Sequence, residues 1–510
     1  MKNSVSVQGV CFVANEGKEV KVEKYHLVVK NGRLVIPKVG VQKADIGISN
    51  GRIVDIAEDI SPERSSDVVD ASNKFIFPGA IDPHFHIGLF RPFKDDARSE
   101  SGSAASGGVT TILSFFRSGP RHHLDKTGPY KQIFPELLEI SRDSYLVDYS
   151  YHVAPMLRIH LDEIEWLVRD MGVSQFKYFV MYRALDLTGS STAASYLGVD
   201  EPLDMGFLYE IMEKVAEANK SVKEYGVVRL AVHCEDPDII RVFTRKVMKK
   251  GSSGNLTRDY HDARPGFAEK VAIHQIGLMA NETGCPITIV HLTSKEAVEA
   301  AREVSRLYPH LDVLKEATLH HLALSYENDY GLYGKVNPPI RGPEDIRHLW
   351  AAISQGEIRS IMSDHACAPK ELKKGDIWTA WPGFGGTSLM FPVMISEGYY
   401  KRGLSLQKIA ELTSYNTAIG HNLFPKKGTL MVGSDADLAI VDLEKEQVVS
   451  KDILFSDQEY TPFEGLKLRG WPVCTILRGR VIYQNGTLKG EAGYGEYVKR
   501  PVLFHYRKGK

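Results

Sequence analysis

The central part of the chain, residues 76–425, alternates short apolar runs with helix-length amphipathic stretches, and this alternation restricts the fold more than any other feature. Strands and helices that alternate along a chain form a parallel sheet with helical connections. Eight of the apolar runs are strand-like, and they are Phe75–Ile81, Val109–Phe116, Tyr145–Ala154, Phe176–Tyr182, Val227–His233, Pro286–His291, Asp312–Glu316 and Ile358–Ser363. Eight such units over ~350 residues predict an α/β fold, a (β/α)₈ barrel of the TIM type with loop insertions.

The two ends of the chain, residues 1–75 and 426–510, consist of short apolar runs separated by turn signals. Asn31-Gly32 and Asn50-Gly51 lie beside such runs, and Asn-Gly in this setting favours a β-hairpin. The C-terminal segments DADLAIVDL and VCTILRGRVIYQNGTLKG have the same pattern. We therefore predict one small β-sandwich domain built from both termini, next to a barrel domain of residues 76–425.

Charge and cysteine content exclude several classes of protein. The 510 residues carry a formal net charge of -1, so no basic surplus favours nucleic acid or an anionic membrane. No uncharged apolar run approaches the ~20 residues that cross a bilayer, and the first residues do not resemble a signal peptide. The 5 cysteines are dispersed and odd in number, as expected for reduced thiols. We expect a cytoplasmic protein without a nucleic-acid or membrane partner.

Ligand-type side chains recur at the carboxyl ends of the predicted strands, where barrel enzymes place their active sites. His84 and His86 follow the first strand and, two residues apart in extended chain, point to one face. His233 and His291 end two neighbouring strands, and Asp364 follows the last strand. Each residue alone would more often be structural, as a histidine in a turn or an aspartate that caps a helix. Their shared position favours a metal centre, because imidazole and carboxylate are common zinc ligands.

Lys177 lies in the strand-like segment FKYFVMY, with apolar or aromatic residues on both sides. A lysine inside a buried strand is costly unless it is paired or modified. In its neutral form the amine can react with CO₂, and the resulting carbamate would offer one oxygen to each of two metal ions. The alternative is a lysine whose amine reaches solvent at the strand edge.

In their order, these residues resemble the amidohydrolase superfamily, in the hydantoinase/dihydropyrimidinase (cyclic amidohydrolase) branch, which is related to dihydroorotase. The similar segments run through nearly the whole chain, and they are PGAIDPHFH, SGSAASGGVTTILSF, FKYFVMY, VHCED, IVHLTS, LHHLAL, KVNPPIR, SDH and YTPFEGLKLRGWPVCTILRGRVIYQNGTL. The resemblance implies a hydrolase that opens a hydantoin- or dihydropyrimidine-like cyclic amide to an N-carbamoyl amino acid. It also implies two divalent metal ions, with Zn²⁺ expected, that activate the attacking water, and a homo-oligomer, a tetramer or dimer.

The resemblance further implies that six side chains hold the two metals, and they are His84, His86, Lys177, His233, His291 and Asp364. The first metal would be bound by His84, His86 and Asp364, and the second by His233 and His291. The lysine, carboxylated to N6-carboxylysine, would bridge the two ions, and Asp364 would also act as the catalytic base.

The resemblance implies two further residues that contact the substrate. The neighbouring sequence does not determine which ring the substrate contains. Tyr182 would hydrogen-bond the oxyanion, and Asn337 would contact the ring amide. Dihydroorotases and allantoinases resemble HxHxR, whose arginine binds a carboxylate or ureide, whereas Gly88 stands two residues after His86 here. The late loop Trp381–Ser388 also departs from the hydantoinase pattern NGxxGxE. The alternatives are a dihydroorotase, an allantoinase or another hydrolase of cyclic amides or lactams. Gly88 argues against a dihydroorotase and an allantoinase.

An alternative of another class is a non-catalytic dihydropyrimidinase-like scaffold, which the six filled ligand positions argue against. The pairs His122-His123 and His320-His321 favour a structural or surface role, because neighbouring residues of a strand point to opposite faces. Cys234 and Cys367 have no separate base and are interpreted as packing thiols.

Overall fold

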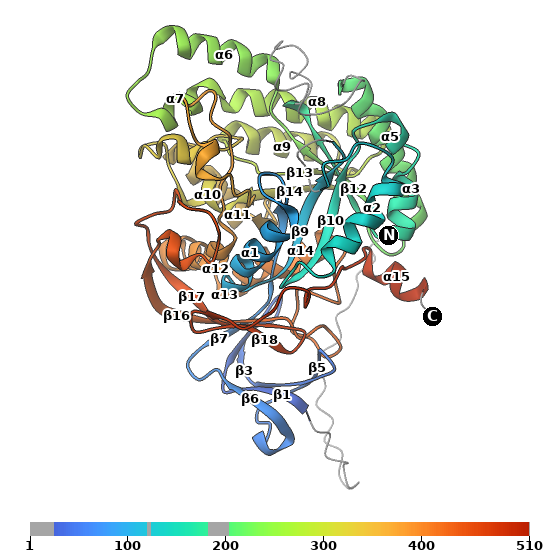
Figure 1. Ribbon diagram of the computed structural model, residues 1–510, viewed down its shortest axis with the longest axis vertical. Coiled ribbons are helices and arrows are strands. Elements are labelled where there is room, and N and C mark those ends of the chain that lie inside the picture. The colour runs from blue at the N-terminus through green and yellow to red at the C-terminus, as the bar shows by residue number, and fades with distance from the viewer. Residues whose placement is uncertain (1–24, 120–123, 182–202, 509–510) are drawn as a thin grey trace.

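A computed structural model describes residues 25–119, 124–181 and 203–508 and contains one parallel sheet of eight strands (Figure 1). In chain order and in sheet order the strands are β8 (Ala80–Phe85), β9 (Val109–Arg117), β10 (Asp148–Ala154), β11 (Gln175–Phe179), β12 (Arg229–His233), β13 (Ile287–Ile289), β14 (Val313–Thr318) and β15 (Ser360–Met362). The sheet closes where Phe85 forms a parallel bridge with His365 and the His86 N–H donates to the His365 carbonyl at 2.8 Å. The predicted (β/α)₈ barrel is confirmed.

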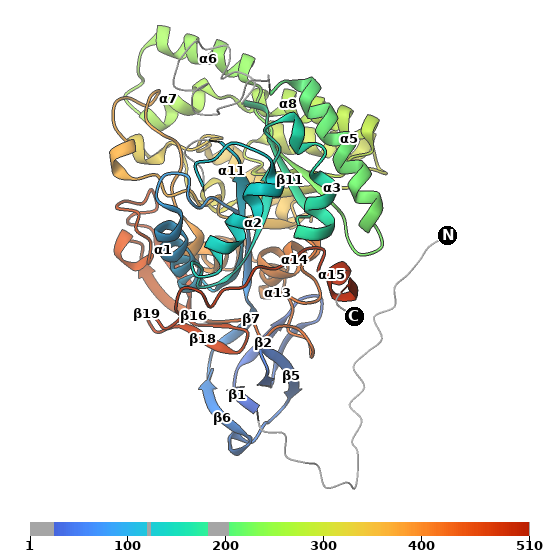
Figure 2. The ribbon, with the colours of Figure 1, turned by 45° about the vertical axis from the view of Figure 1, so that its right-hand side comes forward.

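Helices follow the strands and surround the barrel (Figures 1 and 2). The helices are α1 (Phe93–Ser106), α2 (Tyr130–Ser141), α3 (Ile164–Trp166), α5 (Met205–Val222), α6 (Pro237–Lys250), α7 (Leu256–Ala263), α8 (Gly266–Thr283), α9 (Lys295–Leu307), α10 (Leu319–Ala323), α11 (Pro343–Ser354), α12 (Met390–Val393), α13 (Leu406–Ala410), α14 (Asn416–Gly420) and α15 (Val502–Lys508). Helix α9 has the expected amphipathic pattern, because Ala297, Ala301 and Val304 are buried on one face. None of the helices in the described ranges is long and apolar enough to cross a bilayer.

The chain ends form two packed sheets that lie at the end of the barrel away from α6 and α7 (Figure 2). The first sheet contains, in spatial order, β5 (Arg52–Ala57), β4 (Asp45–Ser49), β1 (Tyr25–Lys30) and β6 (Ser65–Asp70). The second contains β19 (Thr487–Leu488), β18 (Arg480–Gln484), β17 (Lys467–Leu477), β16 (Leu438–Val448), β7 (Phe75–Pro78), β2 (Arg33–Ile36) and β3 (Gly40–Lys43). Leu27, Ile46 and Ile440 belong to one buried cluster of side chains from both sheets. The predicted β-sandwich from both termini is confirmed.

Strand β7 joins the two ends of the chain into one sheet. Its Ile76 lies opposite Leu34 of β2 in parallel pairing and opposite Ile440 of β16 in antiparallel pairing. The predicted domain limits at residues 75/76 and 425/426 stay a prediction.

The predicted strand Phe75–Ile81 was wrong in extent, because this run belongs to two sheets. Residues Phe75–Pro78 form β7 of the sandwich, and the first barrel strand begins at Ala80. Gly79 lies between them and donates its N–H to the Asp437 carbonyl at 2.8 Å. A Cβ at this position would lie 2.2 Å from Thr110 Oγ1, so only glycine allows the close approach.

Candidate metal centre

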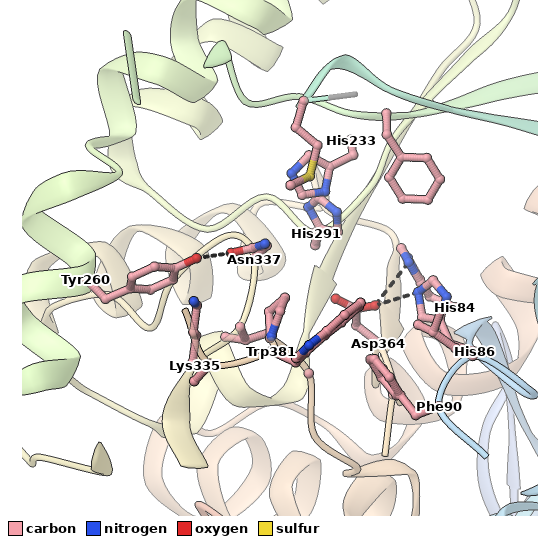
Figure 3. Close-up of a pocket in the computed structure, with 18 of the residues that line it drawn as sticks. His84, His86, Phe90, His233, Tyr260, His291, Lys335, Asn337, Asp364 and Trp381 are labelled. Atoms are coloured by element: carbon pink, nitrogen blue, oxygen red, sulfur yellow. Dashed lines mark hydrogen bonds and ion pairs between the residues drawn. The ribbon is translucent and has the colours of Figure 1, made fainter. Parts of the chain in front are cut away.

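Three of the predicted ligands meet where the barrel closes. His84 belongs to β8, His86 follows this strand, and Asp364 follows β15. Asp364 Oδ1 lies 3.1 Å from His84 Nε2 and 3.2 Å from His86 Nε2 (Figure 3). The three ligand atoms lie within 4.8 Å of one another, a separation that one metal ion could span. The sheet closure between β8 and β15 therefore unites side chains that are far apart in sequence.

The backbone that presents Asp364 is strained and firmly held. Its φ of 53° lies in the left-handed region, which is uncommon for residues other than glycine and is frequent at functional sites. The carboxylate of Asp82 accepts hydrogen bonds from the Ser363 N–H at 3.0 Å, from the Ser363 hydroxyl and from the Thr387 hydroxyl at 2.8 Å. Asp82 of β8 thus fixes the start of the loop after β15.

The other two predicted histidine ligands lie next to this group. The ring centroids of His233 and His291 are 4.5 Å apart, and His291 is 5.5 Å from His84. His291 also has a left-handed backbone, with φ of 36°. The structure therefore brings the histidines of both predicted groups to one mouth of the barrel, at the carboxyl ends of its strands.

Lys177 of β11 is fully buried, and its amine lies among aromatic rings. Its Nζ is 4.4 Å from the ring centroid of Phe115 and 4.8 Å from that of Phe179. Within the described ranges no acceptor lies within hydrogen-bond distance of this atom. Burial lowers the pKa of Lys177 to about 7, although Asp364 and Glu316 oppose the shift. A buried amine that readily becomes neutral fits carbamate formation, and the strand-edge alternative does not hold.

The protonation states suit metal binding. Burial lowers the pKa of His84, His233 and His291, so their imidazoles are neutral and can act as ligands. Burial raises the pKa of Asp364, but His84 and His86 outweigh this effect and hold it well below its ordinary value. Asp364 is therefore an ionised carboxylate at neutral pH.

A chain of hydrogen bonds links His233 to Asn337, and sequence reasoning missed its middle members. His233 Nε2 lies 2.8 Å from Glu235 Oε2, and Arg264 donates to both oxygens of Glu235, at 2.5 and 3.1 Å. Arg264 also donates to the Tyr260 hydroxyl at 3.4 Å, and this hydroxyl donates to Asn337 Oδ1 at 2.6 Å. Because Glu235 engages Nε2, Nδ1 is the nitrogen of His233 that is available to a metal. The spacing of Glu235 two residues after His233 is the only sequence signal for this chain.

A cavity of about 500 Å³ lies over the candidate ligands. Its wall includes the predicted ring contact Asn337, the aromatic residues Phe90, Trp378 and Trp381, and the amine-bearing Lys335. Figure 3 shows Tyr260 and Lys335 on one side of this pocket, with His84, His86 and Phe90 on the other. The predicted oxyanion donor Tyr182 lies outside the described residues.

His320, His321, Cys234 and Cys367 are buried. His321 Nε2 lies 3.1 Å from the Pro339 carbonyl, beside the Asn337 segment. Burial raises the pKa of the Cys234 and Cys367 thiols, as expected for packing thiols. The pair at 122–123 lies outside the described residues.

The fold and the side chains at its mouth define a (β/α)₈ barrel with a candidate metal-binding site. Comparison with known proteins agrees, because the profile of the Amidohydrolase family matches residues 182–482. An L-hydantoinase of Paenarthrobacter aurescens is 30% identical over 93% of this chain and 98% of its own length. An allantoinase of Desulfitobacterium hafniense is 31% identical over 95% of this chain and 99% of its own length.

A solved structure leads to the same family. The L-hydantoinase (dihydropyrimidinase) from Arthrobacter aurescens superposes with a TM-score of 0.81 and 29% identity, over 93% of this chain and 100% of that chain. The chain therefore belongs to the amidohydrolase family. The predicted branch, with hydantoinase, dihydropyrimidinase and allantoinase relatives, and the predicted enzyme class, a hydrolase, are confirmed.

Proposed function

We propose that the protein is a two-metal cyclic amidohydrolase that opens a hydantoin- or dihydropyrimidine-like ring to an N-carbamoyl amino acid. The observation that carries the proposal is the convergence of ligand-type side chains from five barrel strands beside one cavity. The similarity to an L-hydantoinase and to an allantoinase over nearly the full length supports a cyclic amide as the substrate.

The residues present fit two metal ions. His84, His86 and Asp364 would hold the first ion, and His233 and His291 the second. Lys177, carboxylated on Nζ, would bridge them, and its buried amine without an acceptor in the described ranges supports this role. When bound, the two divalent ions, Zn²⁺ in our proposal, lower the pKa of a water molecule and polarise the amide carbonyl.

The protein's own groups would bind the ring and move the proton. Oδ1 of Asp364 faces His84 and His86, which leaves Oδ2 to accept the proton of the attacking water. The same carboxyl group would return the proton to the leaving ring nitrogen. Asn337 would hold the ring amide, and Tyr182 would donate a hydrogen bond to the oxyanion.

Gly88 argues against dihydroorotate and allantoin, because by resemblance those substrates need an arginine two residues after His86. Its N–H donates to Asp96 Oδ2 at 2.7 Å, and it has no side chain to bind an anion. The nearby Arg91 cannot take over, because it pairs with Asp457 and lies 3.6 Å from Glu100. Among the described residues, no arginine lines the cavity that His86 borders, so none there is placed for a substrate carboxylate or ureide.

The test is ring opening by the Zn²⁺-loaded enzyme on hydantoin, dihydrouracil, dihydroorotate and allantoin. We expect hydantoin and dihydrouracil to be opened, and a chelator to remove this activity. Opening of dihydroorotate or allantoin alone would contradict the proposed ring, and no metal-dependent opening of any ring would contradict the proposed reaction.

Glu235→Gln is expected to weaken the second metal site about 10- to 100-fold, as seen when an outer carboxylate partner of a ligand histidine is lost. The reason is that Glu235 holds Nε2 of His233 and is itself held by Arg264. Competition with a chelator measures the metal affinity. Tyr260→Phe is the matched control, because it removes the hydrogen bond to Asn337 and should raise KM without changing the metal affinity. Equal metal affinity in Glu235→Gln and wild type would refute the role of Glu235.

We also propose a homo-oligomer, a tetramer or dimer, in the cytoplasm. Cys234, Cys285, Cys367 and Cys474 are free and buried, which supports a reducing compartment. The resemblance to hydantoinases supports the oligomer, and light scattering on the purified protein would give its size.

A further inference from the structure

The substrate pocket contains a buried amine, that of Lys335, which the proposed reaction does not use. Lys335 lines the cavity two residues before Asn337, and only 5% of its surface is exposed. Its Nζ lies 5.0 Å from the ring centroid of Tyr260 (Figure 3). The amine therefore belongs to the wall that holds the predicted ring contact.

The described part of the protein offers the Lys335 amine few hydrogen-bond acceptors. An ammonium group has three donors, and within the described ranges only the Trp378 carbonyl accepts from Lys335, at 2.9 Å. In the same ranges no carboxylate lies within ion-pair distance of Lys335. The cation of Arg264, which is paired with Glu235, repels the ammonium form of Lys335. Two donors of Lys335 thus have no protein acceptor in the described part of the chain.

A second lysine adds positive charge behind the first. Lys373 is also buried, and its Nζ donates to the Lys335 carbonyl at 3.2 Å. Burial and then Arg264 lower the pKa of Lys335 to about 7, against the opposite effect of the exposed Asp376. Burial and then Lys335 lower the pKa of Lys373 to about 7 as well. A charge in such a site is costly unless an anion enters with it.

We propose that Lys335 binds a carboxylate on the substituent of the ring, so that the preferred substrates are cyclic amides with an acidic side chain. This inference rests on the proposed function and narrows it to a substrate class. The ammonium group would form a charge-assisted hydrogen bond with the carboxylate, while Asn337 beside it holds the ring. The cation lies across the pocket from His86, so it would reach a different part of the substrate than an arginine after His86 would (Figure 3).

The test compares acids with their neutral amides. We would measure kcat/KM of the Zn²⁺-loaded enzyme on hydantoin-5-acetate, hydantoin-5-propionate and the two corresponding amides. For at least one length the acid should be preferred at least about 10-fold, the size of effect expected for a buried charge pair. Lys335→Met should lower kcat/KM for that acid about 100-fold and change the value for the amide less than about 3-fold.

Two further variants separate charge recognition from a structural role. Lys335→Arg keeps the charge and should retain part of the preference for the acid. Lys374→Met removes an exposed lysine next to Lys373 and should leave all four values unchanged. Equal losses for acid and amide in Lys335→Met, or no preference for either acid in wild type, would overturn the inference.

A failure of the proposed function would be distinguishable. If no ring is opened, the proposed function fails, and calorimetric titration of the same four compounds into wild type and Lys335→Met then tests the inference. Tighter binding of an acid than of its amide, in wild type only, would support it. Equal binding of acid and amide would overturn it.

Discussion

Lys177→Ala is expected to lower kcat for ring opening at least about 10³-fold, because metal ions contribute several kcal/mol to transition-state stabilisation. The variant should also bind fewer than two metal ions per chain. The physical reason is the position of Lys177, whose fully buried amine has no acceptor in the described ranges and a pKa lowered by burial to about 7. Without the carbamate the two histidine groups would lose their common ligand. Metal analysis and steady-state kinetics on the same preparation measure both effects.

Lys315→Ala is the matched control for this variant. Lys315 is a half-buried lysine of the barrel strand β14, and it is not among the proposed ligands. This control should keep both metal ions and nearly the full rate. Full activity and two tightly bound ions in Lys177→Ala would contradict the bridging role.

Asp364→Asn is expected to lower kcat about 10²- to 10⁴-fold, the usual contribution of a positioned general base. The replacement keeps the size of the side chain and removes the charge that His84 and His86 stabilise. The first metal should also bind more weakly, because the amide is a poorer ligand than the carboxylate. Measurement of kcat at saturating metal concentration separates the loss of the general base from the weaker binding of the metal.

An exposed carboxylate near the pocket provides the comparison for Asp364→Asn. Asp376 accepts hydrogen bonds from the Trp378 and Thr379 N–H groups, and the amide oxygen of an asparagine could still accept them. Asp376→Asn should therefore change kcat less than about 3-fold, as expected for a solvent-screened charge. A loss in Asp364→Asn that is no larger than the loss in Asp376→Asn would exclude Asp364 as the base.

The barrel and the candidate ligands could be predicted because both follow from local patterns. Each barrel strand is an apolar run, and the carboxyl ends of parallel strands meet at one mouth. His233 at the end of β12 and Asp364 after β15 therefore line one cavity although they are 131 positions apart in sequence. The extent of the first strand was wrong because Phe75–Ile81 resembles one apolar run, whereas Phe75–Pro78 pairs with strands of the sandwich and the barrel strand begins at Ala80.

The residues that surround the candidate ligands, such as Tyr260 and Lys335, could not be predicted, because their positions depend on contacts between loops. Tyr260 and Asn337 are 77 positions apart, and no periodic pattern connects α7 with the loop that precedes α11. Lys335 is one of many lysines in the sequence, and its lack of a carboxylate ion-pair partner among the described residues follows only from the surrounding packing. Long-range loop contacts of this kind are set by the tertiary fold, which sequence periodicity does not describe.

The two-metal centre is the central claim, and its most direct test is titration of the metal-depleted wild-type enzyme with Zn²⁺ while ring opening is followed. The claim predicts no activity without metal and a rate that rises to a plateau at two equivalents per chain. Activity that survives complete metal removal, or a plateau at one equivalent, would contradict it.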